Sequence, residues 1–148
     1  MKFWFGSLVL DAAARLIAPA VLLYAVYVVA HGHTGPGGGF QGGVLFAAGL
    51  ILVKLVRGSG PGRWEIRPAL ALVLACSGVI VYGGIGLVAL AFGGNYLDYS
   101  APGLLGDPVT ERIVGTVGIE VAVALTVAGV ILLVFDALAA WDLDEEPL

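Results

Sequence analysis

Four long apolar runs alternate with three polar or glycine-rich segments along the chain. The runs cover residues 8–30, 39–56, 69–92 and 114–137. As a helix, each run is long enough to cross a hydrocarbon core about 30 Å thick. The pattern predicts an all-α protein, an integral membrane bundle of four transmembrane helices in one domain that covers residues 1–148.

The composition indicates the same setting. Of the 148 residues, 59% are hydrophobic and 12% are charged, whereas a soluble domain has about 25% charged residues. The few Lys and Arg residues are dispersed, so no nucleic-acid-binding patch is expected. Cys76 is the one cysteine and lies inside an apolar run, so the sequence predicts neither a disulfide framework nor a cysteine metal site.

The basic residues predict how the helices are oriented. With four spans, both termini and the second connection lie on one side of the membrane, and that side contains Lys2, Lys54, Arg57, Arg63 and Arg67. The other side has only Arg112. Because cytoplasmic loops are rich in Lys and Arg, both termini are predicted to be cytoplasmic. The segments 31–41 and 93–113 then face outward as polar connections.

The segment from His31 to Gly49 is rich in glycine. Six of the eight residues from Gly35 to Gly42 are Gly or Pro, and Gly39, Gly43 and Ala47 recur at a spacing of four. A stripe of small residues lets two membrane helices approach closely. We therefore predict roles in packing and assembly for a set of residues in this segment: Pro36, Gly37, Gly38, Gly39, Phe40 and Gly43.

Glu120 is an ionisable residue inside the fourth run. Such residues are costly in hydrocarbon and are often functional. Thr116, Glu120, Ala124 and Ala128 recur at a spacing of four, which places Glu120 on a polar and small stripe that faces protein. Two interpretations stay open: a buried carboxyl group that locks helices together, or a group that handles protons or cations, with Thr116 beside it on the stripe.

Three further features carry weaker predictions. Asp11 and Arg15 are four residues apart, so they can form an ion pair on one helix face near the membrane interface. His31 and His33 can either fix the glycine-rich turn by hydrogen bonds or, in the case of His33, titrate on an ion path. No metal site is expected from two histidines alone. Gly83 and Gly84 predict a break or bend in the third helix.

The glycine-rich segment also carries a family resemblance. The run Gly32-His33-Thr34-Gly35-Pro36-Gly37-Gly38-Gly39-Phe40-Gln41-Gly42-Gly43 resembles the signature Gly-His-x-x-Pro-Gly-Gly-Gly-Phe-x-x-Gly of the MnhB/MrpB family. The segment Ala12 to Pro19 is similar to the first helix of that family. The family's last helix has Phe-Asp-x-Gly-Val, where this chain has Ile119-Glu120-Val121-Ala122-Val123.

This resemblance implies a function for the chain as a single MnhB-like domain. Members are small, non-catalytic subunits of Mrp-type multisubunit Na⁺/H⁺ antiporters in the cell membrane, and related subunits occur in the membrane arms of hydrogenase-type redox complexes. The implied partners are the other membrane subunits, the lipid bilayer, and Na⁺ and H⁺ as transported ions. No cofactor is expected. Two roles remain open for the chain, a contribution to an ion path through Glu120 and a purely structural wedge, the latter being favoured in a hydrogenase-type complex.

Overall fold

The structure is a computed structural model that describes residues 8–35, 37–57, 67–103 and 106–144. Its helices are α1 (Leu8–Ala30), α2 (Gly39–Arg57), α3 (Pro68–Ala91) and α4 (Pro108–Asp144). All four are long and apolar enough to cross a membrane. In the described part of the chain there is no strand. The predicted all-α class with four spans is confirmed, and the bounds of the first three helices differ from the prediction by one residue at most.

The fourth helix is longer than predicted, because it begins at Pro108 rather than at residue 114 and ends at Asp144. Its start is fixed by Asp107, whose carboxylate accepts hydrogen bonds from the backbone N–H of Thr110 (3.1 Å) and from its hydroxyl group. Such a cap, with proline in the first helical position, is a common helix start. The bonds from Thr110, and then the one from Val109, lower the pKa of Asp107. Residues 108–113 therefore belong to a helix and not to the predicted connection.

The third helix is continuous. Residues 68–91 form one α-helix that includes Gly83 and Gly84, so the predicted break near Gly83 is absent. A methyl group at either position would meet no atom within 4 Å. These two glycines lie on an open side of the helix, and their lack of a side chain does not serve packing within this chain.

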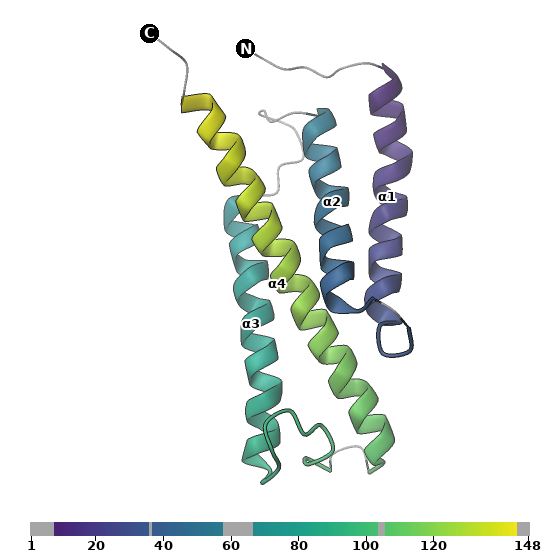
Figure 1. The fold of residues 1–148 in the computed structure, drawn as a ribbon, viewed down its shortest axis with the longest axis vertical. Coiled ribbons are helices and arrows are strands. Elements are labelled where there is room, and N and C mark those ends of the chain that lie inside the picture. Colours follow the sequence, from purple (N-terminus) through teal and green to yellow (C-terminus); the bar gives the residue numbers. More distant parts are fainter. Residues whose placement is uncertain (1–7, 36, 58–66, 104–105, 145–148) are drawn as a thin grey trace.

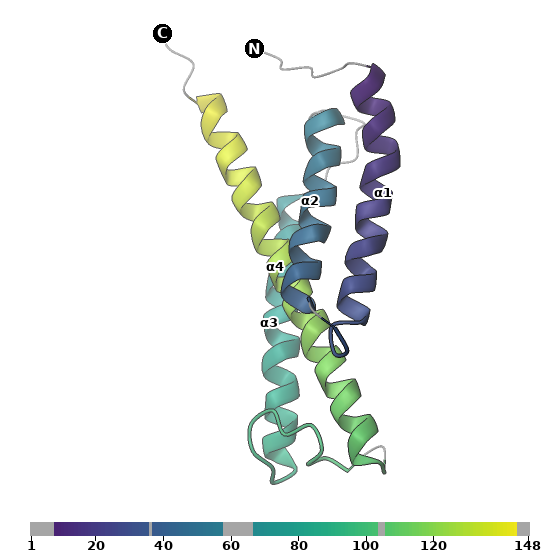
Figure 2. The same cartoon turned by 45° about the vertical axis from the view of Figure 1, so that its right-hand side comes forward.

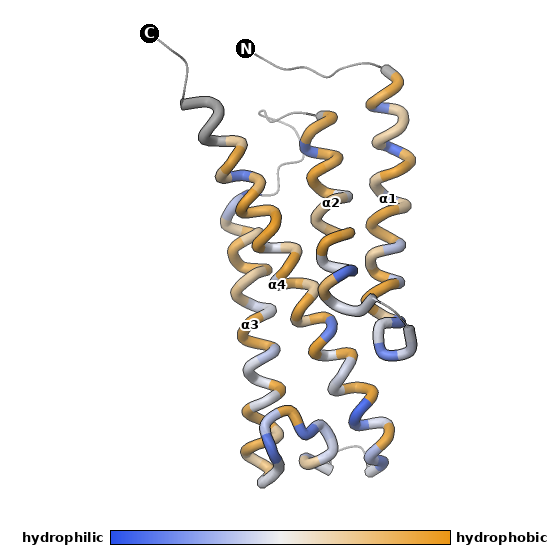
Figure 3. The backbone as a smooth tube through the Cα atoms, in the orientation of Figure 1, coloured by the Kyte–Doolittle hydropathy of each residue, from blue (hydrophilic) through white to orange (hydrophobic). Residues whose placement is uncertain are grey.

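The helices pack in the order α1, α2, α4, α3. Helix α2 lies between α1 and α4, and α4 is packed against α3 on its other side. Figures 1 and 2 both show α4 slanting across the molecule. Within the described residues α3 contacts neither α1 nor α2. The arrangement is an open layer centred on α4 rather than a closed bundle, and it leaves broad apolar helix faces for lipid or other subunits (Figure 3).

The core is made mainly of small residues. Ala47, Ala71, Ala128 and Leu132 form its centre. A methyl group at Gly78 would lie 2.4 Å from the carbonyl oxygen of Ala122, so α3 and α4 touch through their backbones there. Close backbone contact of this kind suits helix packing in lipid, where the hydrophobic effect does not drive helices together.

The two connections on one side of the layer lie at different levels. Figure 1 shows the turn between α1 and α2 part of the way along α4, whereas the connection between α3 and α4 lies at the end of those helices. Glu120 follows Pro108 by 12 residues, which is about 18 Å along a helix. The glycine-rich turn therefore reaches the interior part of α4 and meets Glu120 there.

Candidate functional site

The side chain of Glu120 lies against the glycine-rich turn. A methyl group at Gly32 would lie 2.7 Å from both carboxylate oxygens, and one at Gly38 would lie 3.5 Å from Oε1. A methyl group at Gly39 would lie 2.1 Å from the carbonyl oxygen of Glu120. We call the three glycines at positions 32, 38 and 39 the glycine cradle. Its shape depends on the absence of side chains. A Cβ at Gly32 would meet the Cα of Gly38 (2.4 Å) as well as the carboxylate, one at Gly39 would meet the α4 backbone, and Gly38 has a φ angle of 80° that other residues rarely adopt.

The cradle places the Glu120 carboxylate near a partial positive charge that does not come from a charged side chain. Helix α2 begins at Gly39, and the first N–H groups of a helix carry a partial positive charge and lack intrahelical acceptors. The Glu120 carboxylate is close to this helix start. Its Oε2 atom is nevertheless buried and has no hydrogen-bond partner. A buried carboxylate oxygen without a donor is costly.

The turn that carries the cradle has a defined conformation. Gly37 and Gly38 have φ angles of 137° and 80°, a region that side-chain-bearing residues rarely adopt. His31 donates from Nδ1 to the carbonyl oxygen of Tyr27 (3.1 Å) and stacks on the Tyr27 ring. Thr34 donates from its hydroxyl group to the carbonyl oxygen of His31 (3.0 Å). His31 thus has the role in fixing the turn that the sequence suggested as one alternative.

The other predicted site residues differ in their surroundings. His33 is exposed, and within the described residues it makes no hydrogen bond or ion pair. Thr116 is half-buried one turn before Glu120 on α4. Phe40 is 65% exposed in the first turn of α2, so it does not pack inside this chain. Pro36 lies outside the described residues.

The small-residue stripe of α2 faces α4 of the same chain. Gly39 contacts the backbone at Glu120, and a methyl group at Gly43 would lie 2.7 Å from the carbonyl oxygen of Ala124. Ala47 further along the stripe is fully buried. Because these contacts advance together along both helices, α2 and α4 run parallel in a constant register. We call this contact the α2–α4 seam.

The sequence did not predict a partly buried ion pair at the other end of the seam. Lys54 on α2 donates to Oδ1 of Asp136 on α4, and their side chains are only 12% and 19% exposed. The Lys54 ammonium group also lies 5.9 Å from the centre of the Phe135 ring. The sequence did contain a signal for this pair, namely a basic residue inside the second predicted span and an acidic residue inside the fourth. By contrast, the predicted pair of Asp11 and Arg15 is present at 2.8 Å but is largely exposed.

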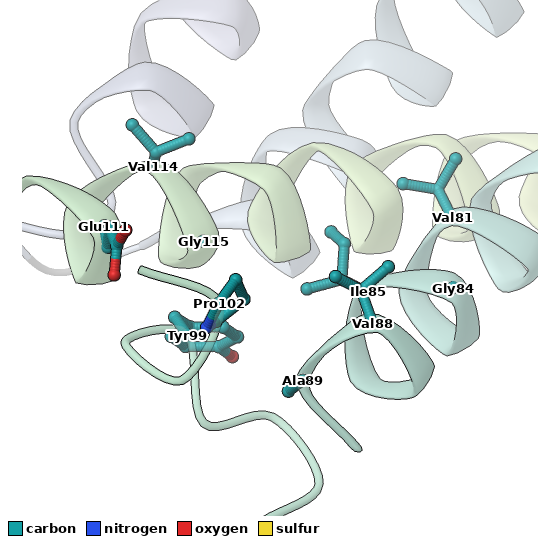
Figure 4. Close-up of a pocket in the computed structure, with 10 residues that line it drawn as sticks. All are labelled: Val81, Gly84, Ile85, Val88, Ala89, Tyr99, Pro102, Glu111, Val114 and Gly115. Atoms are coloured by element: carbon teal, nitrogen blue, oxygen red, sulfur yellow. The ribbon is translucent and has the colours of Figure 1, made fainter. Parts of the chain in front are cut away.

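A second buried acid that the sequence did not indicate is Glu111, which is 6% exposed. It lines an apolar cavity of about 500 Å³ between α3, α4 and the connection that joins them. Figure 4 shows Tyr99 and Pro102 from this connection beneath the α4 segment that carries Glu111 and Gly115. Burial raises the pKa of Tyr99, and the neighbouring Tyr82 and Tyr96 add to the rise.

Within the parts of the chain that the structure describes, no three His, Cys, Asp or Glu side chains form a group that could hold a metal ion. The ionisable groups that lie in helix contacts or beside the cavity are Glu120, the Lys54 and Asp136 pair, and Glu111.

Comparison with known proteins decides the family. A family described as "Domain related to MnhB subunit of Na+/H+ antiporter" matches residues 9–133. The chain belongs to the MnhB family. The match spans α1, α2, α3 and most of α4, so it includes the glycine cradle and Glu120, and it confirms the resemblance drawn from the sequence.

The similarity to individual relatives in the MnhB family extends over most of each chain. The chain is 27% identical to a Na(+)/H(+) antiporter subunit of Bacillus subtilis (strain 168), over 84% of this chain and 87% of that protein. It is 28% identical to "Putative antiporter subunit mnhB2" of Staphylococcus haemolyticus (strain JCSC1435), over 90% and 95%. The chain is thus an MnhB-type, multi-pass membrane protein of a family of transporter subunits rather than enzymes.

Proposed function

We propose that this chain is a non-catalytic subunit of a multisubunit monovalent cation/proton antiporter, and that Glu120 lies on an ion path of the assembled complex. The observation that carries the proposal is the buried, unpartnered Oε2 atom of Glu120 beside the glycine cradle. The carboxylate has a source of positive potential at the α2 N-terminus but no ion-pair partner within the described residues. It can therefore accept a proton or a cation without first breaking an ion pair.

The competing role is a structural lock. A carboxyl group that only locks helices gains most when both oxygens accept hydrogen bonds, because an unsatisfied buried oxygen costs about 1–3 kcal/mol. The Glu120 site does not meet that condition. Of its contacts to the cradle, the one to Gly39 is made by the main chain of Glu120, which provides it whether or not the side chain is charged.

Ions are not expected to travel along the seam inside this chain. Beyond Glu120 the seam is closed by the Gly43–Ala124 contact and by the buried residues Ala47, Ala128 and Leu132. A groove of about 540 Å³, lined by residues of all four helices, has only apolar lining. An ion path through Glu120 would therefore pass from the turn side of this subunit into a neighbouring subunit, with His33 and Thr116 as further candidates on this chain.

The test uses Glu120 variants in membrane vesicles that contain the whole complex. Glu120→Gln keeps the volume of the side chain but cannot ionise, so it should assemble in normal amount and lose Na⁺/H⁺ exchange. Glu120→Asp should keep part of the exchange. Transport is measured with a pH-sensitive dye after a Na⁺ pulse and is normalised to the amount of assembled complex. Full exchange by Glu120→Gln, together with loss of the complex in Glu120→Leu, would establish the lock instead.

The second part of the proposal concerns the assembly. The glycines of the cradle and Gly43 shape this chain, while the exposed ring of Phe40 is available to a neighbouring subunit. We expect the chain to co-purify in mild detergent with other antiporter subunits. Co-purification with iron–sulfur subunits would instead place it in the membrane arm of a hydrogenase-type complex, an alternative that Gln41 in the glycine-rich signature weakly favours.

The third part concerns orientation. The basic residues predict that both termini are cytoplasmic. In a Cys76→Ala background, cysteine at Ser59 should react with a membrane-impermeant reagent from the cytoplasmic side and cysteine at Ser100 from the outside. The opposite labelling pattern would invert the proposed orientation and move the Glu120 end of the seam towards the cytoplasm.

A further inference from the structure

The partly buried pair of Lys54 and Asp136 has two features that a stabilising ion pair does not need: a buried carboxylate oxygen without a partner, and a lysine that points into the protein. One carboxylate oxygen, Oδ1, accepts from the Lys54 ammonium group, but the other oxygen, Oδ2, is buried and has no partner. Within the described residues no further hydrogen bond or ion pair reaches either side chain; Asp11 and Arg15 on α1 are paired with each other. The pair is therefore neutral as a whole but incompletely satisfied.

The direction of the Lys54 side chain is informative. Lys54 lies three residues before the end of α2 at Arg57, and a lysine near a helix end in a membrane usually extends its ammonium group to the interface. Lys54 instead points into the protein, where 12% of its side chain is exposed. A buried ion pair contributes little net stability, because the cost of removing both charges from water offsets their attraction. The arrangement indicates a role other than stability.

Charge balance limits what the pair can do. In a medium of low dielectric the site must stay close to neutral. If Lys54 loses a proton, the Asp136 carboxylate needs another positive charge, and its unpartnered Oδ2 gives a monovalent cation an oxygen ligand. If the cation leaves, Lys54 must regain a proton. The two positive charges therefore compete for one carboxylate, and each can replace the other without a net change in charge.

We propose that Lys54 and Asp136 form a second ion-exchange site, in which Lys54 releases a proton when a monovalent cation such as Na⁺ binds the Asp136 carboxylate. An N–H bond of the ammonium group breaks, its electron pair stays on Nζ, the proton passes to water, and the positive charge of the cation then balances the Asp136 carboxylate. No oxidant or reductant is involved. Water or a neighbouring subunit completes the coordination of the cation.

This site is distinct from Glu120. Sixteen residues of α4 separate Asp136 from Glu120, which is about 24 Å along a helix and close to the thickness of a hydrocarbon core of about 30 Å. The inference rests on the proposed function, since it requires a complex that exchanges a monovalent cation for protons. It adds a site near the opposite end of the seam.

The most selective test is Lys54→Arg in the complete complex. Arginine keeps the positive charge and can pair with Asp136, but its guanidinium group does not lose a proton in proteins. We expect the Lys54→Arg complex to assemble in normal amount and its Na⁺/H⁺ exchange in vesicles to fall to the level of vesicles without the complex. The double variant Lys54→Gln/Asp136→Asn removes both charges, leaves no unpaired ion, and should give the same result. Exchange at the parental rate by either assembled variant would overturn the proposal.

A measurement on the unmodified complex covers the case in which neither variant assembles. Only the neutral amine of a lysine reacts with an amine-directed reagent, so Na⁺ should increase the rate at which Lys54 is labelled by a membrane-permeant reagent, as read by mass spectrometry. A labelling rate that does not change with Na⁺ would overturn the proposal. Glu120→Gln is measured in parallel: loss of exchange there with parental exchange in Lys54→Arg would reject this site and leave the proposed function intact.

Discussion

The two ends of the α2–α4 seam bury a carboxylate in different ways. At one end Glu120 lies in the glycine cradle, beside the α2 N-terminus and without an ion-pair partner among the described residues. At the other end Asp136 is paired with Lys54 near the α2 C-terminus. Both positions suit the helix macrodipole of α2, since a carboxylate is favoured at its start and a lysine in its last turns. The first end depends on shape and the second on charge.

The two ends of the seam are therefore sensitive to different kinds of substitution. The cradle fails when atoms are added, because its walls are backbone. The ion pair fails when one charge is removed, because the remaining charge stays buried. Between the two ends the helices are brought close together by the Gly43–Ala124 contact and by buried Ala47, Ala128 and Leu132, so each carboxylate lies at its own end of the seam. The same two helices thus carry carboxyl groups at both ends of the seam.

The largest loss of stability is expected from breaking the pair on one side. Asp136→Asn leaves the Lys54 charge buried and unpaired, which should lower the free energy of unfolding by about 3–5 kcal/mol. The matched double variant Lys54→Gln/Asp136→Asn should recover most of this loss. Thermal unfolding of the purified complex, together with its yield, gives the comparison. Equal stability of the single and double variants would show that the ion pair does not hold this end.

A smaller loss is expected from filling the cradle. Gly39→Ala places a methyl group 2.1 Å from the Glu120 carbonyl oxygen, and overpacking of this kind costs about 1–3 kcal/mol; Gly39→Leu should prevent assembly. Gly83→Ala is the control, because a methyl group there meets nothing within 4 Å and alanine favours a helix by about 1 kcal/mol. The yields of the two complexes measure the effect, and similar yields would remove the cradle as a shape-dependent site.

The smallest effect is expected at the exposed pair. Asp11 and Arg15 are ion-paired at 2.8 Å, as Lys54 and Asp136 are paired, but their side chains are 38% and 68% exposed. Exposed pairs contribute about 0–1 kcal/mol, and salt weakens them further. Asp11→Asn should therefore change the unfolding temperature of the complex little, and less at high salt. A loss as large as that of Asp136→Asn would mean that burial does not distinguish these two pairs.

The fold could be read from the sequence because each membrane helix is a long apolar run whose length is set by the bilayer. The bounds of α1, α2 and α3 follow from these runs to within one residue. The predicted start of α4 was too late because the first residues of this helix are polar and do not belong to the apolar run. The Asp107 cap and Pro108 fix the start instead. Gly83 shows the converse, since glycine lowers helix propensity but did not end a helix in an apolar run.

The candidate site was only partly predictable. Glu120 and the stripe of Gly39 and Gly43 were visible because their spacing places them on one helix face. Which helix that face meets, and in which register, cannot be read from one sequence. Lys54 and Asp136 are 82 positions apart in the sequence. From the sequence alone, Lys54 counted only among the basic residues that predict the orientation of the helices. Contacts between helices, unlike faces of a helix, require the three-dimensional arrangement.

Infrared difference spectroscopy of the assembled complex in lipid tests most directly whether Glu120 exchanges ions. A change of pH or addition of Na⁺ should alter a carboxyl band in the parent complex, because Glu120 gains or loses a proton. This band should be absent from the Glu120→Gln spectrum and should persist in the Lys54→Gln/Asp136→Asn spectrum, since the two ends act separately. A Glu120→Gln spectrum identical to that of the parent would contradict an ion path through Glu120.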